Sequence, residues 1–445
     1  MRTDTTPRLN LDTIDLSSAA PQRSEEEPLC FDLWGEKRVY RSSYTCWFSR
    51  TTERTHEILA RNIHRSPLVT GELDSLGPRY CPSIEDKFLR FPDRTTHPIV
   101  FEPVSPETRE VYVQNFSTSL PYDVQVEMVR SLPGCGDAKI VRPGYGIEYA
   151  YIIPDQLSLS LENRNLPGLF CAGQVNGSSG YEEAAGQGLL AGINAALSAA
   201  ERAPLTLSRS DGYLGVLVDD LVTKSTEEPY RMLTSRCEHR LLMRYDNAAR
   251  RLSPLGRQVG LIDDARLAEL ERRWRQEDRE IARLQASRLV PSPRLESLCL
   301  EEGADVPREP LSAAAFLRRR GATYSLVAAI TPPERPLEAD SALYVETELR
   351  YAGYIEKETR LAGRAADLDK VLIPRDFDYD SVRGLLAESR QKLLRFRPAS
   401  LGQALRISGV TPVDVQLLSV ALRGRRGRSG PEGPKDPKGG DEHGE

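Results

Sequence analysis

The chain has 445 residues, of which 39% are hydrophobic and 28% charged, and its net charge is −5. This composition is typical of a globular protein with a sizeable core, and it excludes a strongly basic nucleic-acid binder, so RNA contact would have to come from local patches. The seven cysteines are scattered and form no CxxC pair, which argues against a zinc knuckle or a disulfide framework and favours a reducing cytoplasm. No apolar run is long enough to predict a membrane span.

The first part of the chain alternates short β-rich segments with turns. Residues 38–40 and 98–101 have the β-branched and aromatic composition of strands. Residues 52–59 predict a helix, which either Thr51 or Thr52 would cap. The histidines of this region are too isolated to suggest a metal site, so no metal is expected.

The next part has an α/β pattern. Residues 123–130 have the apolar spacing of a helix, and residues 169–172 form a short apolar run typical of a buried strand. Glycines follow this run, and residues 182–200 then predict a helix built of small side chains. The order strand, glycine turn and helix is therefore expected here.

From about residue 205 the pattern becomes helical. Apolar side chains recur at a heptad-like spacing, which predicts a long amphipathic helix packed against its neighbours; they are Leu267, Leu270, Trp274, Ile281 and Leu284. Residues 300–340 are richer in proline and are expected to be looser, whereas residues 341–422 predict a second helical unit. Residues 423–445 are mostly glycine, proline and charged residues without apolar side chains, so they are expected to be disordered.

The glycine-rich turn after residue 172 is the most informative motif. Gly173, Gly177 and Gly180 precede the small-residue helix, and such a turn offers backbone N–H groups and the positive end of a helix dipole to an anion. The alternative interpretation is a tightly packed strand–helix crossover that binds no ligand.

A second motif surrounds Cys81. Arg79 and Lys87 flank this cysteine, and nearby positive charge lowers the pKa of a thiol and favours the nucleophilic thiolate. The alternative is a structural cysteine without reactivity.

Four arginines follow in the helical region at spacings of five, four and four, and a basic helical stripe of this kind suits tRNA phosphates; they are Arg231, Arg236, Arg240 and Arg244. The alternative is a solvated face that forms salt bridges, since Glu238 lies among them.

Residues 168–188 and 77–91 closely resemble two motifs of the tRNA uridine-34 carboxymethylaminomethyl-modification flavoproteins, the MnmG (GidA) family. Matching segments extend over roughly residues 1–422. The resemblance implies an α/β plus all-α fold, in which a partial FAD/NAD(P)-binding Rossmann-like domain carries an inserted α+β nicotinamide-binding domain and is followed by a helical C-terminal domain. The implied domains are residues 1–116 (inserted NAD-binding-like region), 117–203 (C-terminal part of the FAD domain), 204–340 (helical domain), 341–422 (helical subdomain for tRNA and partner binding) and 423–445 (tail).

The resemblance also assigns roles to individual residues. Cys81 is the catalytic candidate. The FAD contacts are expected at Gly173, Gln174, Asn176, Gly177, Gly180 and Glu182. The NAD contacts are expected at Gly77, Pro78, Arg79, Tyr80, Ser83, Lys87 and Phe91. The family's helical C-terminal region serves tRNA and partner binding, which favours RNA contact by the four arginines.

The activity implied by the resemblance is carboxymethylaminomethyl or aminomethyl modification at C5 of the wobble uridine in tRNA. FAD is the expected redox carrier, NADH the reductant and methylenetetrahydrofolate the one-carbon donor. The expected partners are tRNA, the GTPase MnmE and a second copy of the chain, as a homodimer within a heterotetrameric complex in the cytoplasm.

Two departures from the family pattern stand out. The sequence contains no GxGxxG loop, the motif that would hold the FAD pyrophosphate, so the first part of the FAD domain is expected to be missing. Asp4 stands where a glycine is usual. Two alternatives follow: a catalytically impaired module that binds tRNA or MnmE, and a folate- and FAD-dependent tRNA methyltransferase. The long helical region argues against the methyltransferase.

Overall fold

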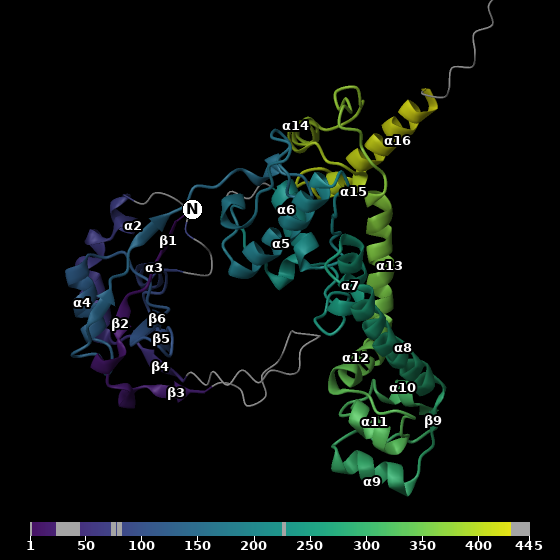
Figure 1. Cartoon of the computed structure of the whole chain (residues 1–445), viewed down its shortest axis with the longest axis horizontal. Coiled ribbons are helices and arrows are strands. Elements are labelled where there is room, and N and C mark those ends of the chain that lie inside the picture. The colour runs from purple at the N-terminus through teal and green to yellow at the C-terminus, as the bar shows by residue number, and fades with distance from the viewer. Residues whose placement is uncertain (1, 24–44, 73–76, 78–81, 225–227, 429–445) are drawn as a thin grey trace, which may run out of the picture. The chain divides into compact units, whose positions relative to one another are not determined.

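The computed structural model describes residues 2–23, 45–72, 77, 82–224 and 228–428. The chain divides into two compact units, named here the N-terminal unit (residues 1–156, 160–201 and 226–233) and the C-terminal unit (residues 157–159, 202–225 and 234–445). Figure 1 shows their elements. The predicted strand at residues 38–40 lies outside the described residues.

Strands and helices alternate in the N-terminal unit. Its strands are β1 (Arg2–Asp4), β2 (Arg8–Asn10), β3 (Ala20–Gln22), β4 (Cys46–Arg50), β5 (Pro98–Pro103), β6 (Glu110–Gln114), β7 (Ile140–Arg142) and β8 (Gly146–Glu148). Its α-helices are α1 (Glu53–Asn62), α2 (Pro67–Thr70), α3 (Ile84–Arg90), α4 (Tyr122–Arg130) and α5 (Tyr181–Ala199). Its 3-10 helices are η1 (Leu11–Thr13), η2 (Leu16–Ser18), η3 (Ile63–Arg65), η4 (Pro154–Gln156) and η5 (Gly173–Asn176).

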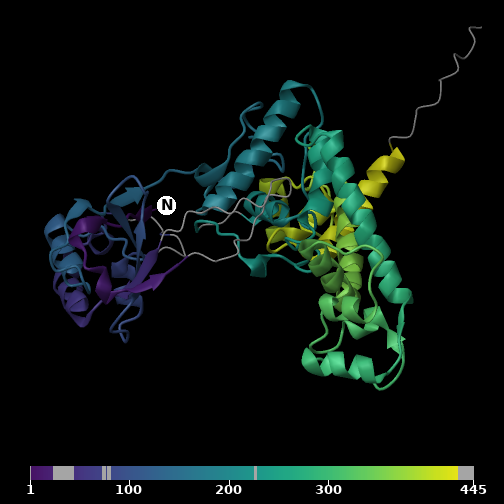
Figure 2. The same ribbon diagram turned by 60° about the horizontal axis from the view of Figure 1, so that its bottom comes forward.

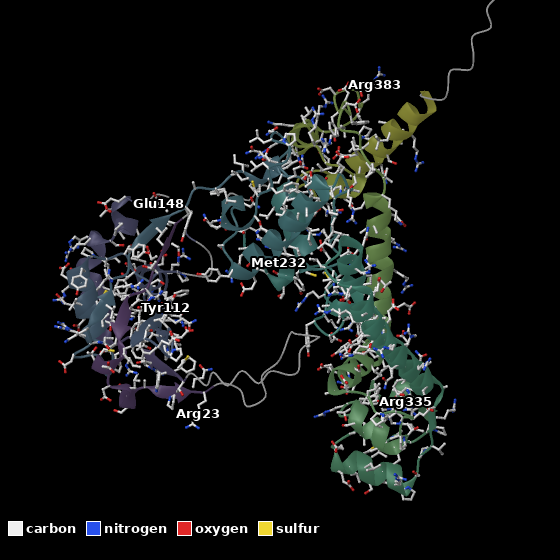
Figure 3. The ribbon with its side chains drawn as sticks, viewed as in Figure 1. Arg23, Tyr112, Glu148, Met232, Arg335 and Arg383 are labelled. Carbon is white, nitrogen blue, oxygen red and sulfur yellow. The ribbon has the colours of Figure 1, made fainter. Side chains whose placement is uncertain are left out.

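An antiparallel sheet organises the first part of this unit. Its six strands lie in the order β3-β4-β5-β6-β2-β7, and β1 pairs separately with β8. In the paired strands β5 and β6, Phe101 stands opposite Val113, and both side chains are fully buried. Tyr112 points to the other side of β6 and is labelled in Figure 3. The guanidinium of Arg8 packs over its ring, 4.1 Å from the ring centre. One face of the strand is therefore apolar, and the other carries polar contacts.

The local signals for α1 and α4 are confirmed. Thr52 is the N-cap of α1, where its Oγ1 accepts from the N–H of Thr55 while Thr55 Oγ1 accepts from the N–H of Thr52. This capping box satisfies two backbone donors that the helix itself cannot. The same hydrophobic core contains Ile58 of α1, Phe116 and Met128 of α4, so the domain boundary predicted between residues 116 and 117 falls inside a continuous core.

A stacked histidine pair lies where α1 meets β5. The rings of His56 and His97 are 5.3 Å apart and nearly parallel, and the edge of Phe88 from α3 contacts His56. The Nε2 atom of His56 is 3.0 Å from Thr51 Oγ1, whereas the buried Nε2 of His97 has no hydrogen-bond partner. The pair therefore suits two neutral rings.

Acidification should weaken the N-terminal unit through this pair. Burial lowers the pKa of both His56 and His97, and for His97 the charge of His56 adds to the effect. Because the folded pKa values lie below the unfolded value of 6.5, the stabilisation is present above that pH and is lost as the pH falls through the folded values. Urea unfolding at several pH values should show a smaller acid loss in His97→Gln than in wild type. The exposed His64→Gln variant serves as the control and should keep the wild-type loss; equal profiles for the two variants would contradict this prediction.

The strand predicted at residues 169–172 is wrong. This segment forms a single isolated bridge between Glu162 and Phe170, and Leu169 is 45% exposed. A buried strand needs a hydrogen-bonded neighbour along its length, and the described residues supply only this one bridge. The helix predicted at residues 182–200 is confirmed as α5.

The C-terminal unit is almost entirely helical and is drawn in teal to yellow in Figure 1 and Figure 2. Its helices are α6 (Tyr213–Lys224), η6 (Thr234–Arg236), α7 (Ala248–Val259), α8 (Asp264–Ala286), α9 (Pro293–Glu301), α10 (Ala313–Phe316), α11 (Tyr324–Ile330), α12 (Ala339–Arg350), α13 (Ala352–Asp369), α14 (Ala387–Phe396), α15 (Leu401–Arg406) and α16 (Pro412–Arg428). A short ribbon joins β9 (Arg288–Leu289) to β10 (Leu311–Ser312). Within the described part of the chain, no helix is both long and apolar enough to cross a membrane.

Two hydrophobic cores hold this unit together. The first includes Leu284 of α8, Phe316 and Val345, and the second includes Leu393 and Leu418. The predicted amphipathic helix is confirmed as α8, and Ile281 and Leu284 of its stripe pack into the first core.

Two expectations for the C-terminal unit are wrong. Residues 300–340 are not loose, because α10 and α11 lie in this stretch and Phe316 is fully buried. Disorder from residue 423 is also wrong, since α16 continues to Arg428; residues 429–445 lie outside the described residues.

Candidate functional site

The glycine-rich turn, residues 173–180, consists of η5 and the residues that lead into α5, and two of its glycines have left-handed backbone. Gly173 has φ +82° and Gly177 has φ +77°, values that favour glycine because a Cβ would be strained there. The missing side chains also leave space for neighbours: a Cβ on Gly173 would press on Ala184, and one on Gly177 would press on the ring of Tyr151. The predicted FAD residues of this turn are thus brought together by backbone geometry.

Gln187 of α5 holds the turn from beneath. Its side chain is fully buried, and its Oε1 accepts from the Nδ2 of Asn176 at 2.8 Å and from the N–H of Gly173 at 3.2 Å. Its Nε2 donates to Ser178 Oγ at 2.7 Å and to the carbonyl of Glu183 at 3.1 Å. One amide therefore fixes the start, the middle and the end of the turn.

One polar atom of this turn remains without a protein partner. Asn176 is fully buried and donates to the carbonyl of Cys171 as well as to Gln187, but its Oδ1 accepts no hydrogen bond. A buried acceptor without a donor is costly. The turn therefore has unsatisfied capacity for one N–H or O–H donor.

The N-terminus of α5 already holds a carboxylate of the protein. Glu183 is buried, and its Oε1 accepts from the N–H of Met232 at 2.8 Å (Figure 3). Its side chain fills the space beside Gly180, where a Cβ would overlap it, and Arg231 approaches the same Oε1 at 3.5 Å. The start of α5 therefore already carries one carboxylate of the protein, with the guanidinium of Arg231 beside it.

The remaining predicted FAD residues lie nearer to solvent. Gln174 is half-buried, and its Nε2 lies 3.5 Å from the carbonyl of Ala150. The side chain of Glu182 is 85% exposed and makes only a loose 4.0 Å contact with Arg231. The structure thus brings the glycines, Asn176 and Gln174 together and leaves Glu182 on the rim.

The predicted nicotinamide segment is described only in part. Pro78, Arg79, Tyr80 and Cys81 lie outside the described residues. The described members of the set are Gly77, Ser83, Lys87 and Phe91.

Three of the described members, Ser83, Lys87 and Phe91, belong to α3 or its caps. Ser83 is buried and caps α3, where its Oγ accepts from the N–H of Asp86 at 3.0 Å. Lys87 donates through Nζ to the carbonyl of Asn115 at 2.7 Å. The ring of Phe91 is half exposed, with the guanidinium of Arg94 above it. Ser83 and Lys87 therefore help to fix the position of α3.

The basic helical stripe predicted for the four arginines is wrong. Residues 228–247, ahead of α7, form turns and the short η6. Tertiary contacts use backbone groups that a helix would need: the N–H of Tyr230 donates to the carbonyl of Gly177, and the N–H of Leu241 donates to the carboxylate of Glu358. Arg231 approaches Glu183, Arg236 approaches Asp220, and Arg244 is bonded to Asp246 and Glu348. Arg240 is exposed and lies beside the Tyr213 hydroxyl. The alternative interpretation, in which these arginines form salt bridges, holds for Arg231, Arg236 and Arg244.

Sequence reasoning missed Gln187, Glu183 and Asn194, which are all buried on one side of α5. Their spacing of four and seven residues places them in register with the apolar Leu190 and Leu197. Polar residues that interrupt the buried face of a helix were the available signal, since each of them needs a hydrogen-bond partner there.

Comparisons with known proteins cover nearly the whole chain. Residues 1–203 match the family model described as glucose inhibited division protein A. Residues 264–359 and 362–443 match the models described as the C-terminal helical domain and the C-terminal helical bundle of the tRNA modifying enzyme MnmG/GidA.

Curated relatives and solved structures agree with these models. The chain is 47% identical to the tRNA uridine 5-carboxymethylaminomethyl modification enzyme MnmG of Exiguobacterium sibiricum over 94% of its own length and 67% of the relative. It is also 47% identical to the enzyme of the same name from Heliobacterium modesticaldum, over 95% and 67%. The structure of Aquifex aeolicus GidA (form II crystal) superposes with a TM-score of 0.83 at 38% identity, covering 95% of this chain and 67% of that one. The mixed α/β and helical fold class is thereby confirmed.

Proposed function

Since this chain belongs to the MnmG/GidA family of tRNA-modifying enzymes, we propose that it takes part in carboxymethylaminomethyl modification at C5 of the wobble uridine of tRNA. The observation that carries this proposal is the 47% identity over 94% of the chain to an enzyme named for that reaction. The matches to both helical C-terminal models favour this function over that of the folate-dependent tRNA methyltransferase.

The family is FAD-dependent, and the glycine-rich turn of residues 173–180 suits one part of that cofactor. The buried Oδ1 of Asn176 lacks a donor, and an isoalloxazine ring carries an N–H that would supply one. The carboxylate of Glu183 at the start of α5 would repel the pyrophosphate. We therefore assign the flavin ring end to this turn, with Gly173, Gln174, Asn176 and Gly177 as its contacts and Gly180 and Glu182 at its margin. Bound FAD would supply two-electron redox chemistry.

The remaining assignments follow from the family. NADH is proposed as the reductant at the segment of residues 77–91, with methylenetetrahydrofolate as the one-carbon donor and Cys81 as the nucleophile or acid/base at the uridine ring. The half-exposed ring of Phe91 supports a stacking contact with a flat ligand. Gly77, Pro78, Arg79, Tyr80, Ser83 and Lys87 complete the proposed NAD contacts.

The family implies tRNA binding, and exposed Arg240 is the strongest candidate contact among the four arginines. Arg231 and Arg236 are partly exposed and are proposed as secondary contacts, whereas Arg244 is fixed by its two carboxylates. The proposed assembly is a cytoplasmic homodimer that joins the GTPase MnmE in a heterotetramer.

Flavin binding and nucleoside analysis together test the proposal. The purified chain should bind FAD with the visible absorbance of a flavoprotein, and a cell lacking the modification should regain it when the chain is expressed. Gln174→Ala should weaken FAD binding about tenfold, the effect of one hydrogen bond, while the exposed Gln258→Ala on α7 should not. Retained tRNA binding without FAD binding would instead support the alternative of an impaired tRNA- or MnmE-binding module.

A further inference from the structure

A groove of about 430 Å³ lies in the C-terminal unit, between α7 with the turns ahead of it and the helices α12 and α13 (Figure 1). Pockets that hold small molecules have volumes of this order. Of the residues given a role above, only Arg244 lines the groove, and its guanidinium is held by Asp246 and Glu348. The groove therefore shares no residue with the flavin turn or with the nicotinamide segment.

One face of α13 forms an apolar wall of the groove. Ile355, Ala362 and Ala366 line it, and their spacing of seven and four residues places them on the same side of the helix. Gly363 belongs to the same wall, and a Cβ there would meet no atom within 4 Å, so open space borders the helix at this point. Leu241 adds apolar surface from the turns ahead of α7. These side chains suit the apolar body of a ligand.

Arg251 of α7 brings a half-buried guanidinium without a carboxylate partner to the groove. Its Nε donates to Asn247 Oδ1 at 2.8 Å. Its terminal nitrogens donate to the carbonyls of Asp211 and Arg244, the latter at 3.2 Å. Within the described residues these three acceptors are its hydrogen-bond partners, and no carboxylate forms an ion pair with it. A guanidinium has five N–H donors, so one on each terminal nitrogen remains for a further acceptor.

The charges around the groove favour a ligand with one negative charge. Burial lowers the pKa of Arg251 and the like charge of Arg244 lowers it further, and a bound anion would compensate both effects. Two carboxylates oppose a second negative charge: Glu348 lines the groove, and Glu358 accepts from the N–H of Leu241 at its edge. A carboxylate therefore fits better than a phosphate dianion, and arginine binds carboxylates through pairs of N–H groups.

We propose that this groove binds a small monocarboxylate with an apolar body, such as an aromatic acid. The carboxylate accepts from the two remaining N–H groups of Arg251, and the apolar body lies against Ala362 and Gly363. Because the walls come from α7 and α13, an occupied groove joins these two helices. This site goes beyond the proposed function and does not depend on it.

Saturation-transfer NMR with cinnamate, an aromatic monocarboxylate, tests the site on the full chain. Wild type should bind cinnamate saturably. The neutral cinnamamide has the same apolar body without the charge, so it should bind at least about tenfold more weakly, the effect of losing a charged hydrogen-bond pair. Inorganic phosphate has charge without an apolar body, and it should displace cinnamate only at concentrations at least about tenfold higher than unlabelled cinnamate requires.

Two variants, each with a matched control, locate the binding. Arg251→Met should weaken cinnamate binding at least about tenfold, whereas Arg257→Met, which changes an exposed arginine of the same helix, should not. Gly363→Leu fills the groove and should abolish binding, whereas Gly353→Leu, at another open position of α13, should bind as wild type. The open space beside Gly363 means that this variant keeps the fold, so the test does not depend on the stability of Arg251→Met.

Four results would overturn the proposal. They are a wild type without saturable cinnamate binding, equal affinities for cinnamate and cinnamamide, displacement by phosphate as effective as that by cinnamate, and wild-type affinity in Gly363→Leu.

Discussion

Replacing Arg209 with methionine is expected to lower the free energy of unfolding of the C-terminal unit by about 3 to 5 kcal/mol, the usual cost of leaving a buried charge without its partner. Arg209 is buried and donates to Asp219 at 3.1 Å and to Asp220 at 2.7 Å. Its other nitrogens bind both oxygens of Glu238. Burial opposes the charge, but Asp220 and Asp219 hold the pKa of Arg209 above its usual value. Methionine fills similar space without any donor.

The other cations near Asp219 and Asp220 should compensate only part of the stability that Arg209→Met loses. Arg406 from α15 donates to both oxygens of Asp219, and Lys224 contacts Asp220 at 2.7 Å. Asp220→Asn in the Arg209→Met background should therefore cost less than it does alone, a coupling that a double-mutant cycle measures. Urea denaturation gives the free energy of unfolding of the four proteins in this cycle: wild type, Arg209→Met, Asp220→Asn and the double variant.

Arg257→Met is the matched control. Arg257 forms an exposed pair with Asp264, and exposed pairs contribute less than about 1 kcal/mol. If Arg209→Met loses no more stability than this control, then water and the remaining cations, and not Arg209, satisfy Asp219 and Asp220.

Local signals predicted much of this fold. The threonine cap of α1 and the apolar stripe of α8 depend on residues within one or two turns, so the sequence was sufficient for both. The strand at residues 169–172 was wrong because its backbone groups bond to the nearby residues Leu161, Asn163 and Leu166 and pair with no second strand. The helix through the four arginines was wrong because backbone groups in that segment bond to residues far along the chain. Composition and spacing carry no information on such partners.

The candidate site divides in the same way. The glycine-rich turn was predicted from the sequence, and Gly173 and Gly177 have the left-handed backbone that favours glycine, whereas Gly180 is extended. The hydrogen bonds of Gln187 could not be predicted, because the only sequence signal for this residue is a polar side chain on the buried face of a helix. The role of Cys81 stays a prediction.

Gln187→Leu is expected to lower the free energy of unfolding of the N-terminal unit by about 2 to 4 kcal/mol, since it removes four hydrogen bonds at once and leaves buried partners unsatisfied. Leucine has nearly the same volume, so a cavity does not explain the loss. Asn176 and Ser178 lose their bonds to the side chain, and the N–H of Gly173 loses its acceptor. Thermal or urea unfolding monitored by circular dichroism gives the value.

The adjacent Gly188→Ala change separates the network from general effects on α5. A Cβ at Gly188 meets no atom within 4 Å, and alanine raises helix propensity, so stability should rise by up to about 1 kcal/mol. FAD titration under conditions where both variants remain folded then tests the site: Gln187→Leu should bind FAD more weakly than wild type because the turn is no longer held in place. Wild-type affinity in a destabilised Gln187→Leu would mean that the glycines alone shape the turn, and the network would then stabilise the fold without preparing the flavin contact.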